Sequence, residues 1–229
     1  MFPPILFAPM IAEQPISLLT RDGVTVEARL HAPGTATRGV VVSHPHPLYG
    51  GDMDNPVVVE ITTACAAEGL ATLRFNFRGV GRSTGSHDHG RAEQQDLTSA
   101  LDRLVARLGE DQVAAAGYSF GAMVTAAVAA KRADLLALAL VAPPLTRAAA
   151  LDEVGRLPMP VLVIAGDEDD YCPPGLLADI GRGRPAAAVQ VIKGADHFFR
   201  EQLEALGAAV RAWARQLATR QAPGGRRSG

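Results

Sequence analysis

The sequence holds a serine, an acidic segment and a histidine, each of which follows a short apolar run. The serine, Ser119, lies in GYSFG, the acidic segment is GDEDDYCP at 166–173, and the histidine, His197, ends the segment KGADH. A serine hydroxyl attacks a carbonyl when a neutral imidazole accepts its proton and a carboxylate orients the imidazolium that forms. These residue types, in this order, predict acyl transfer with Ser119 as nucleophile and His197 as general base.

The pattern Gly-x-Ser-x-Gly occurs twice, so the pattern alone does not identify the nucleophile. Ser119 follows the apolar run DQVAAA and precedes the small-residue segment AMVTAAVAA, as a serine on a tight strand-to-helix turn would. Ser83, in GRSTG, lies among Arg, Thr, Gly, Ser and His, and no helix is predicted directly after it. We therefore expect Ser119 to be the nucleophile and Ser83 to be a loop residue.

Two fixed N–H groups must stabilise the oxyanion that forms when a serine attacks a carbonyl. One is expected from the backbone of Phe120, which follows the nucleophile. The other is expected from the loop HPHPLYGG at 44–51, in which Pro47 has no N–H to donate. The remaining candidates for the second donor are His46, Leu48 and Tyr49.

Short apolar runs alternate with longer amphipathic stretches, and this alternation predicts the elements that position these residues. Strands are expected at 39–43, 71–75, 113–116, 135–141, 161–165 and 189–192, and helices at 56–68, 91–108, 121–131 and 198–217. Such a repeat, preceded by a hairpin around 21–23, predicts a mostly parallel central sheet flanked by helices on both faces. Ligands of these sheets bind beyond the carboxyl ends of the strands, where all three polar groups are expected.

Two His-x-His groups suggest a rival chemistry at the same edge of the sheet. His44 and His46 form one group, and His87, Asp88 and His89 belong to the other. Imidazoles in loops can bind zinc, so a metal-dependent hydrolase is an alternative interpretation. A metal mechanism would leave the ordered serine, acid and histidine unexplained, and we therefore expect no metal and no other cofactor.

On these motifs, the sequence resembles the α/β-hydrolase superfamily. The segments HPHPLYGG, FNFRGVG, GYSFG and DHFF are similar to those of a group of small bacterial hydrolases without a lid. The resemblance extends over residues 16–217 and implies the α/β-hydrolase fold with no cap domain. It also favours His46 as the second oxyanion donor.

The resemblance further implies which acid assists the histidine. The superfamily spaces a glycine, the acid and a proline as Gly166, Asp169 and Pro173 are spaced here, which favours Asp169; Asp170 is the alternative. The chain departs from the superfamily at Asn76, where Asp is common. That departure concerns the support of a loop rather than the catalytic residues.

Charge, cysteine content and hydropathy limit the partners. The formal net charge is −2 and the basic cluster Arg226 and Arg227 lies in a Gly-rich tail, so no nucleic-acid partner is expected. The two cysteines, Cys65 and Cys172, are too few and too far apart for a disulfide framework, which indicates a reducing cytoplasm. The sequence has no run of about 18 apolar residues, so no membrane-spanning helix is predicted. The expected partner is a small-molecule ester.

The chain is expected to fold as one α/β-hydrolase domain over residues 16–219. The apolar segment 1–15 is interrupted by prolines and is interpreted as an N-terminal arm rather than a signal peptide; it permits a homodimer without requiring one. Residues 220–229 are expected to form a disordered tail. Fewer than twenty residues separate the strands at 135–141 and 161–165, too few for a cap domain.

Together these features predict a serine carboxylesterase that hydrolyses short- to medium-chain esters through Ser119, His197 and Asp169 by way of an acyl-enzyme. A thioesterase, a peptidase or a perhydrolase would use the same residues, because pocket shape sets the leaving group. A metal-dependent hydrolase and a non-catalytic binding protein on the same scaffold are the alternatives from other classes.

Overall fold

The structure, a computed structural model, describes residues 11–146, 154, 157–183 and 187–220. Most of the expected N-terminal arm at 1–15 and all but the first residue of the expected tail at 220–229 lie outside this part of the chain.

Eight strands form one sheet in the order β1-β2-β4-β3-β5-β6-β7-β8. They are β1 Gln14–Leu19, β2 Thr25–His31, β3 Gly39–Ser43, β4 Ala71–Phe75, β5 Val113–Tyr118, β6 Leu135–Val141, β7 Val161–Gly166 and β8 Ala187–Ile192. Strands β1 and β2 are antiparallel to their neighbours, whereas β3 to β8 run parallel. The mostly parallel sheet predicted from the sequence is confirmed.

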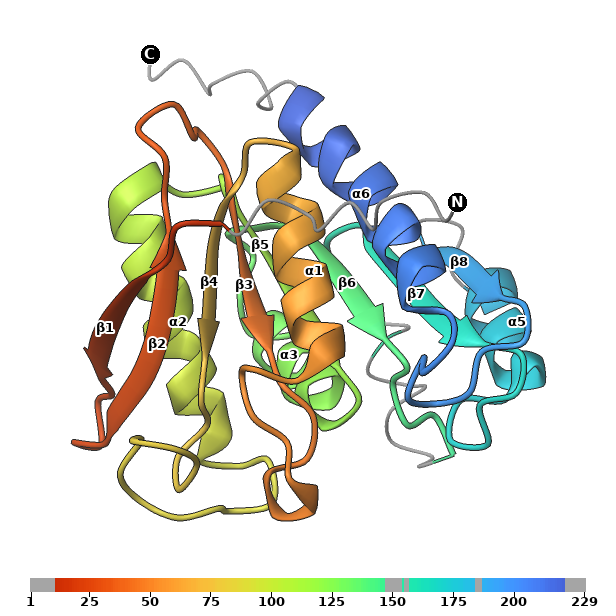
Figure 1. The fold of residues 1–229 in the computed structure, drawn as a ribbon, viewed down its shortest axis with the longest axis horizontal. Coiled ribbons are helices and arrows are strands. Elements are labelled where there is room, and N and C mark those ends of the chain that lie inside the picture. The colour runs from red at the N-terminus through yellow and green to blue at the C-terminus, as the bar shows by residue number, and fades with distance from the viewer. Residues whose placement is uncertain (1–10, 147–153, 155–156, 184–186, 221–229) are drawn as a thin grey trace, which may run out of the picture.

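Helices cover both faces of this sheet (Figure 1). They are α1 Pro56–Ala67, α2 Glu93–Leu108, α3 Phe120–Ala129, α5 Pro174–Gly183 and α6 Leu203–Thr219, with a short 3₁₀ helix, η1, at Pro47–Tyr49. Apolar side chains of α1 and α6 pack on one face, and those of α2, α3 and α5 pack on the other. None of the described helices is long and apolar enough to cross a membrane.

The predicted hairpin joins β1 to β2 at the edge of the sheet. Its turn includes Gly23, whose φ of 84° suits glycine and whose N–H donates to the carbonyl of Thr20 at 3.1 Å. Strand β1 begins at Gln14, inside the range expected for the arm. The preceding residue, Glu13, binds Arg74 of β4 through both carboxylate oxygens, at 2.8 and 2.5 Å.

The largest difference from the predicted helices lies before α6, which begins at Leu203 rather than at 198. The carboxylate of Asp196 accepts the N–H of Phe198 at 2.9 Å, and Phe199 has a φ of 53°. A positive φ does not belong in a right-handed helix, so these residues form a turn instead. Helix α5 is absent from the sequence prediction altogether.

Candidate active site

Ser119 lies on a strained turn between β5 and α3. Its φ of 54° and ψ of −115° are unusual for a residue with a side chain, and such strain clusters at functional sites. The flanking glycines make the turn possible: a Cβ at Gly117 would lie 2.5 Å from the carbonyl oxygen of Gly121, and one at Gly121 would lie 2.6 Å from that of Ser43. The motif therefore places a serine where the backbone leaves no room for neighbouring side chains.

The structure brings Ser119, His197 and Asp169 into one hydrogen-bonded chain. The hydroxyl oxygen of Ser119 lies 3.0 Å from Nε2 of His197, and Nδ1 of His197 lies 2.9 and 3.0 Å from the two carboxylate oxygens of Asp169. A carboxylate accepts the Nδ1–H proton, so the lone pair of Nε2 faces the serine hydroxyl. This geometry allows His197 to take a proton from Ser119.

Of the two acids left open by the sequence, the structure places Asp169 against His197. Asp169 is 2% exposed, and its Oδ1 also accepts the N–H groups of Tyr171 at 2.8 Å and Cys172 at 3.1 Å. These two donors fix the orientation of the carboxylate. Asp170 is exposed to solvent.

Tyr118 supports the histidine, a role that sequence reasoning missed. Its hydroxyl is buried and donates to the carbonyl of His197 at 2.9 Å. Burial, together with the nearby carboxylate of Asp169, raises the pKa of the Tyr118 phenol, so the hydroxyl keeps its proton. The only sequence signal was an aromatic residue beside Ser119.

The candidate oxyanion donors differ in what their amides do. Phe120 is the first residue of α3, where the N–H has no intrahelical acceptor. In the loop, the N–H of Leu48 donates to Nδ1 of His46 at 3.2 Å and that of Tyr49 to the carbonyl of His46 at 3.1 Å. The backbone N–H groups of Leu48 and Tyr49 are thus already bonded to His46. The His46 ring contacts the Phe120 ring, with 4.9 Å between the two centroids.

The hydroxyl of Ser119 faces a cleft of about 560 Å³, called here the Ser119 cleft. The described residues that line it include no Asp, Glu, Lys or Arg. They are Pro45, His46, Tyr49, Gly50, Gly51, Asn55, Tyr118, Ser119, Phe120, Met123, Pro144, Thr146, Tyr171, His197 and Phe198. Within the described part of the chain, no domain covers this cleft.

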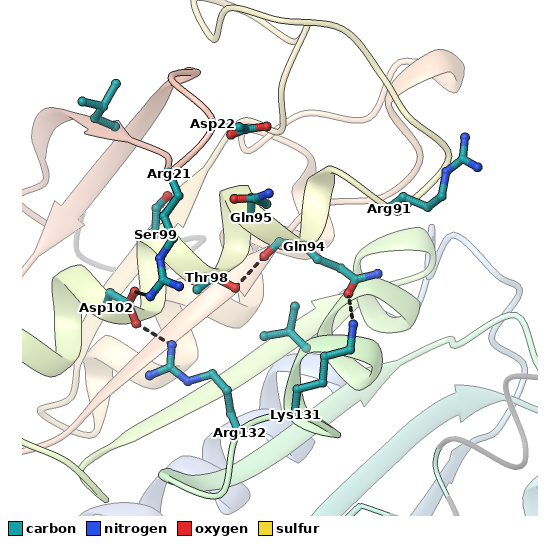
Figure 2. Close-up of a pocket in the computed structure, with 12 residues that line it drawn as sticks. Arg21, Asp22, Arg91, Gln94, Gln95, Thr98, Ser99, Asp102, Lys131 and Arg132 are labelled. Atoms are coloured by element: carbon teal, nitrogen blue, oxygen red, sulfur yellow. Dashed lines mark hydrogen bonds and ion pairs between the residues drawn. The ribbon is translucent and has the colours of Figure 1, made fainter.

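A second hollow, of about 930 Å³, lies along α2 and is called here the α2 groove (Figure 2). It is lined by Leu19, Arg21, Asp22, Arg91, Gln94, Gln95, Thr98, Ser99, Asp102, Val128, Lys131 and Arg132. Lys131 donates to the amide oxygen of Gln94 at 2.8 Å, and Arg132 binds Asp102 at 2.5 Å. Other polar groups of this groove are bonded to residues outside it, as Asp22 is to Arg78 and Arg91 to Asp88.

The second Gly-x-Ser-x-Gly serine, Ser83, has a structural role. Its hydroxyl donates to the carbonyl of Asn76 at 2.7 Å and accepts the N–H of Glu27 at 2.9 Å. The Asn76 side chain in turn accepts the N–H of Met53 and donates to the Glu27 carboxylate. An aspartate at position 76 would face that carboxylate with a like charge, which accounts for the amide found there.

The histidines of the predicted metal alternative do not assemble a ligand set in the described residues. His44 is buried; its Nε2 accepts the N–H of Phe77 at 2.9 Å and its Nδ1 lies 2.7 Å from the carbonyl oxygen of Pro45. Burial lowers the pKa of His44 to about 4. In the ranges that the structure describes, no three His, Cys, Asp or Glu side chains are grouped to hold a metal ion.

A serine on a strand-to-helix turn at the carboxyl edge of a mostly parallel sheet, with an acid and a histidine from later loops, defines an α/β serine hydrolase. Comparison with known proteins agrees with this class. Residues 40–220 match the α/β hydrolase domain family. An uncharacterised protein of Rickettsia prowazekii is 32% identical over 179 residues, which cover 74% of this chain and 75% of that protein. The chain belongs to the α/β hydrolase family and is a hydrolase.

Solved structures show the same fold. An α/β serine hydrolase homologue from Coxiella burnetii is 31% identical, with a TM-score of 0.79 over 87% of this chain and 96% of that one. An α/β serine hydrolase without a lid from Xanthomonas campestris is 29% identical, with a TM-score of 0.81 over 92% and 97% of the two chains. The resemblance to lidless α/β hydrolases is confirmed.

Proposed function

We propose that the protein is a serine carboxylesterase that acts on short- to medium-chain esters. The observation that carries this proposal is the hydrogen-bonded chain from Ser119 through His197 to Asp169, which ends at the Ser119 cleft. Ser119 is the nucleophile, His197 the general base and acid, and Asp169 the group that orients His197.

The reaction proceeds in two acyl transfers. The hydroxyl oxygen of Ser119 attacks the ester carbonyl while its proton passes to Nε2 of His197, and the carboxylate of Asp169 stabilises the imidazolium. His197 then gives the proton to the leaving alkoxide, and an acyl-enzyme remains on Ser119. A water molecule that loses its proton to His197 attacks this ester, and the carboxylic acid leaves with Ser119 restored.

The oxyanion of each tetrahedral intermediate is stabilised by two backbone donors. The N–H of Phe120 is one of them, since it opens α3 beside the nucleophile. The N–H of His46 is the other. The position of His46 beside Phe120, the ring contact between the two residues and the engagement of Leu48 and Tyr49 within their own loop support this choice.

The lining of the Ser119 cleft supports a small neutral substrate. Its described lining residues include no Asp, Glu, Lys or Arg, so no opposite charge among them would stabilise an ionic group of the substrate near the ester. A cleft of about 560 Å³ holds a small molecule, and the described residues build no long tunnel for a fatty acyl chain.

The state of the cysteines supports a cytoplasmic enzyme. Cys65 and Cys172 are both free and buried. Burial raises the pKa of each thiol, which leaves them protonated and poorly nucleophilic. Unpaired thiols of this kind fit a reducing compartment.

The proposal is tested with p-nitrophenyl esters from acetyl to palmitoyl, with and without EDTA. Ser119→Ala is expected to lower kcat by about 10³-fold or more, because the nucleophile is lost. Ser83→Ala, in the second Gly-x-Ser-x-Gly pattern, is the matched control and should retain turnover. A kcat of Ser119→Ala within about tenfold of the wild-type value, or loss of activity with EDTA, would contradict the proposal. Faster turnover of a matched thioester, peptide or peracid-forming reaction would point to another acyl hydrolase.

A further inference from the structure

A buried carboxylate organises the loop before α2. Glu93, in the first turn of α2, is fully buried, and its two oxygens accept the N–H of Asp88 at 2.7 Å and the N–H of Gly90 at 2.8 Å. A carboxylate removed from water is costly unless donors surround it, so these bonds hold residues 88–90 firmly in place. The sequence predicted a helix from residue 91, but α2 begins at Glu93. The bonds from Asp88 and Gly90 to the Glu93 carboxylate account for this difference.

The same carboxylate contacts a histidine that the proposed mechanism does not use. Nδ1 of His87 lies 2.8 Å from Oε1 of Glu93, at an angle outside that of a regular hydrogen bond, and the His87 side chain is 7% exposed. Neither ring nitrogen of His87 makes a regular hydrogen bond to any described residue. A buried imidazole held in this way calls for a functional explanation.

The ring of His87 packs against both residues proposed to bind the oxyanion. Its centroid lies 5.0 Å from that of His46 and 5.5 Å from that of Phe120, and the His46 and Phe120 rings are 4.9 Å apart. The three rings therefore form one cluster, which joins the loop after β3, the start of α3 and the loop before α2. His87 does not belong to the residues that line the Ser119 cleft.

His46 is the centre of its own loop, so its position sets the position of the loop backbone. Its carbonyl accepts the N–H groups of Tyr49 and Gly51, both at 3.1 Å, and its Nδ1 accepts that of Leu48. A displacement of the His46 ring would move these groups together. An oxyanion donor acts only when it is held close to the place where the charge develops, and small misplacements reduce the rate strongly.

We propose that Glu93 and His87 form a positioning pair for the oxyanion hole. Glu93 fixes the loop that carries His87, and the His87 ring holds His46 against Phe120 so that the two backbone donors converge. The inference rests on the proposed serine-hydrolase function, but it concerns residues outside the Ser119, His197 and Asp169 chain. The pair acts through His46 and Phe120 and does not touch the substrate.

A positioning role predicts a particular split between binding and turnover. The oxyanion exists only after attack, so a displaced donor lowers kcat while the KM for a neutral ester stays almost unchanged. The rate at which a fluorophosphonate probe labels Ser119 should fall in parallel, because its phosphoryl oxygen needs the same donors. A residue that merely shaped the substrate pocket would change KM instead.

The experiment measures kcat and KM for p-nitrophenyl acetate and the second-order labelling rate with the fluorophosphonate. His87→Ala should lower kcat and the labelling rate about tenfold each, with KM within twofold of the wild-type value. His87→Phe keeps a ring against His46 and should recover most of the lost rate. Glu93→Gln places an amide nitrogen near backbone N–H donors and should lower both rates. His31→Ala, a histidine on β2, is the control and should change neither.

The outcomes separate this inference from the proposed function. If the wild-type protein is not labelled at Ser119, the serine-hydrolase proposal fails, and the positioning pair fails with it. If the wild type is labelled and His87→Ala matches it within twofold, or changes KM alone, the positioning pair is wrong and the proposed function stands. Should His87→Ala not fold, the ratio of His87→Phe to Glu93→Gln decides: equal rates would overturn the inference.

Discussion

The Ser119 cleft and the α2 groove show that the size of a hollow does not identify a site. The α2 groove is the larger, about 930 Å³ against about 560 Å³, and it holds more charged side chains. Some of those charged side chains are already bonded within the groove: Lys131 donates to the amide oxygen of Gln94, and Arg132 binds the carboxylate of Asp102. The Ser119 cleft has no fixed charge among its described lining residues.

What separates the two hollows is the direction of their hydrogen bonds. In the α2 groove, the polar side chains that bond to each other are exposed to water. Water competes for the same hydrogen bonds, so each contact contributes little to the free energy of unfolding. At the Ser119 cleft, the hydrogen bonds form one chain. The backbone N–H of Tyr171 donates to the buried carboxylate of Asp169, which contacts His197, and His197 contacts the hydroxyl of Ser119 on its strained backbone. We therefore expect reactivity at the Ser119 cleft, where hydrogen-bonded groups are aligned toward one hydroxyl, and not in the α2 groove.

The strongest way to test this comparison is to interrupt the aligned chain. Asp169→Asn keeps the shape of the side chain but favours the wrong tautomer of His197, and we expect kcat for p-nitrophenyl acetate to fall about 10⁴-fold. Asp170→Asn, on the exposed neighbouring residue, is the matched control and should stay within twofold of wild type. A larger loss in Asp170→Asn would show that the acid has been misassigned.

The two regions should also differ in how acid destabilises them. Burial lowers the pKa of His44, which begins the loop over the Ser119 cleft, to about 4, whereas an unfolded histidine titrates near 6.5. Between these values the unfolded chain binds a proton that the native protein does not, so the free energy of unfolding falls as pH drops below about 6.5. The expected loss from pH 7 to pH 5 is about 2 kcal/mol.

Urea unfolding of the wild type and of His44→Gln at pH 7 and pH 5 measures this loss, which the variant should lack. Asp22 in the α2 groove provides the contrast. Hydrogen bonds from Arg78 and Thr20 lower the pKa of Asp22 to about 2. The contribution of Asp22 to the free energy of unfolding is therefore present above about pH 4 and is lost as pH falls through 2. Equal pH dependence in the wild type and His44→Gln would refute the assignment to His44.

The smallest effects should come from single lining side chains. Met123→Ala removes part of the apolar lining of the Ser119 cleft and should raise the KM for butyrate esters roughly fivefold, about the value of one or two methylene groups. Lys131→Ala removes an exposed contact in the α2 groove and should leave turnover within twofold and stability within about 0.5 kcal/mol. If Lys131→Ala has the larger effect on turnover, the α2 groove takes part in the reaction.

Much of the fold and the proximity of the candidate site residues followed from the sequence, because parallel strands place their carboxyl ends at one edge of the sheet. Ser119, the acidic segment and His197 each follow such a strand. Asp169 was favoured over Asp170 through a spacing pattern, and the structure gives the physical basis: the Asp169 carboxylate is buried and accepts two backbone N–H groups.

The remaining features depend on contacts between distant residues and leave no periodic trace. The hydrogen bond from Tyr118 to His197 joins residues far apart in the chain, and Glu93 looks like any acidic residue at a helix start. Phe198 and Phe199 were predicted to begin the last helix, at 198–217, but they lie in a turn before α6. This turn arises from Asp196, whose side chain competes for backbone N–H groups.

The order of the strands along the chain sets the order in which the residues of the candidate site are synthesised. Ser119 follows β5, in the middle of the sheet, whereas Asp169 and His197 follow β7 and β8, the last strands added at one edge. During synthesis, Ser119 leaves the ribosome before Asp169 and His197, because it precedes both in the sequence, and a domain generally folds as a unit. On the proposed mechanism, we therefore expect Ser119 of a nascent chain to be inert until β8 has paired, so that the onset of hydrolysis marks the completion of the sheet.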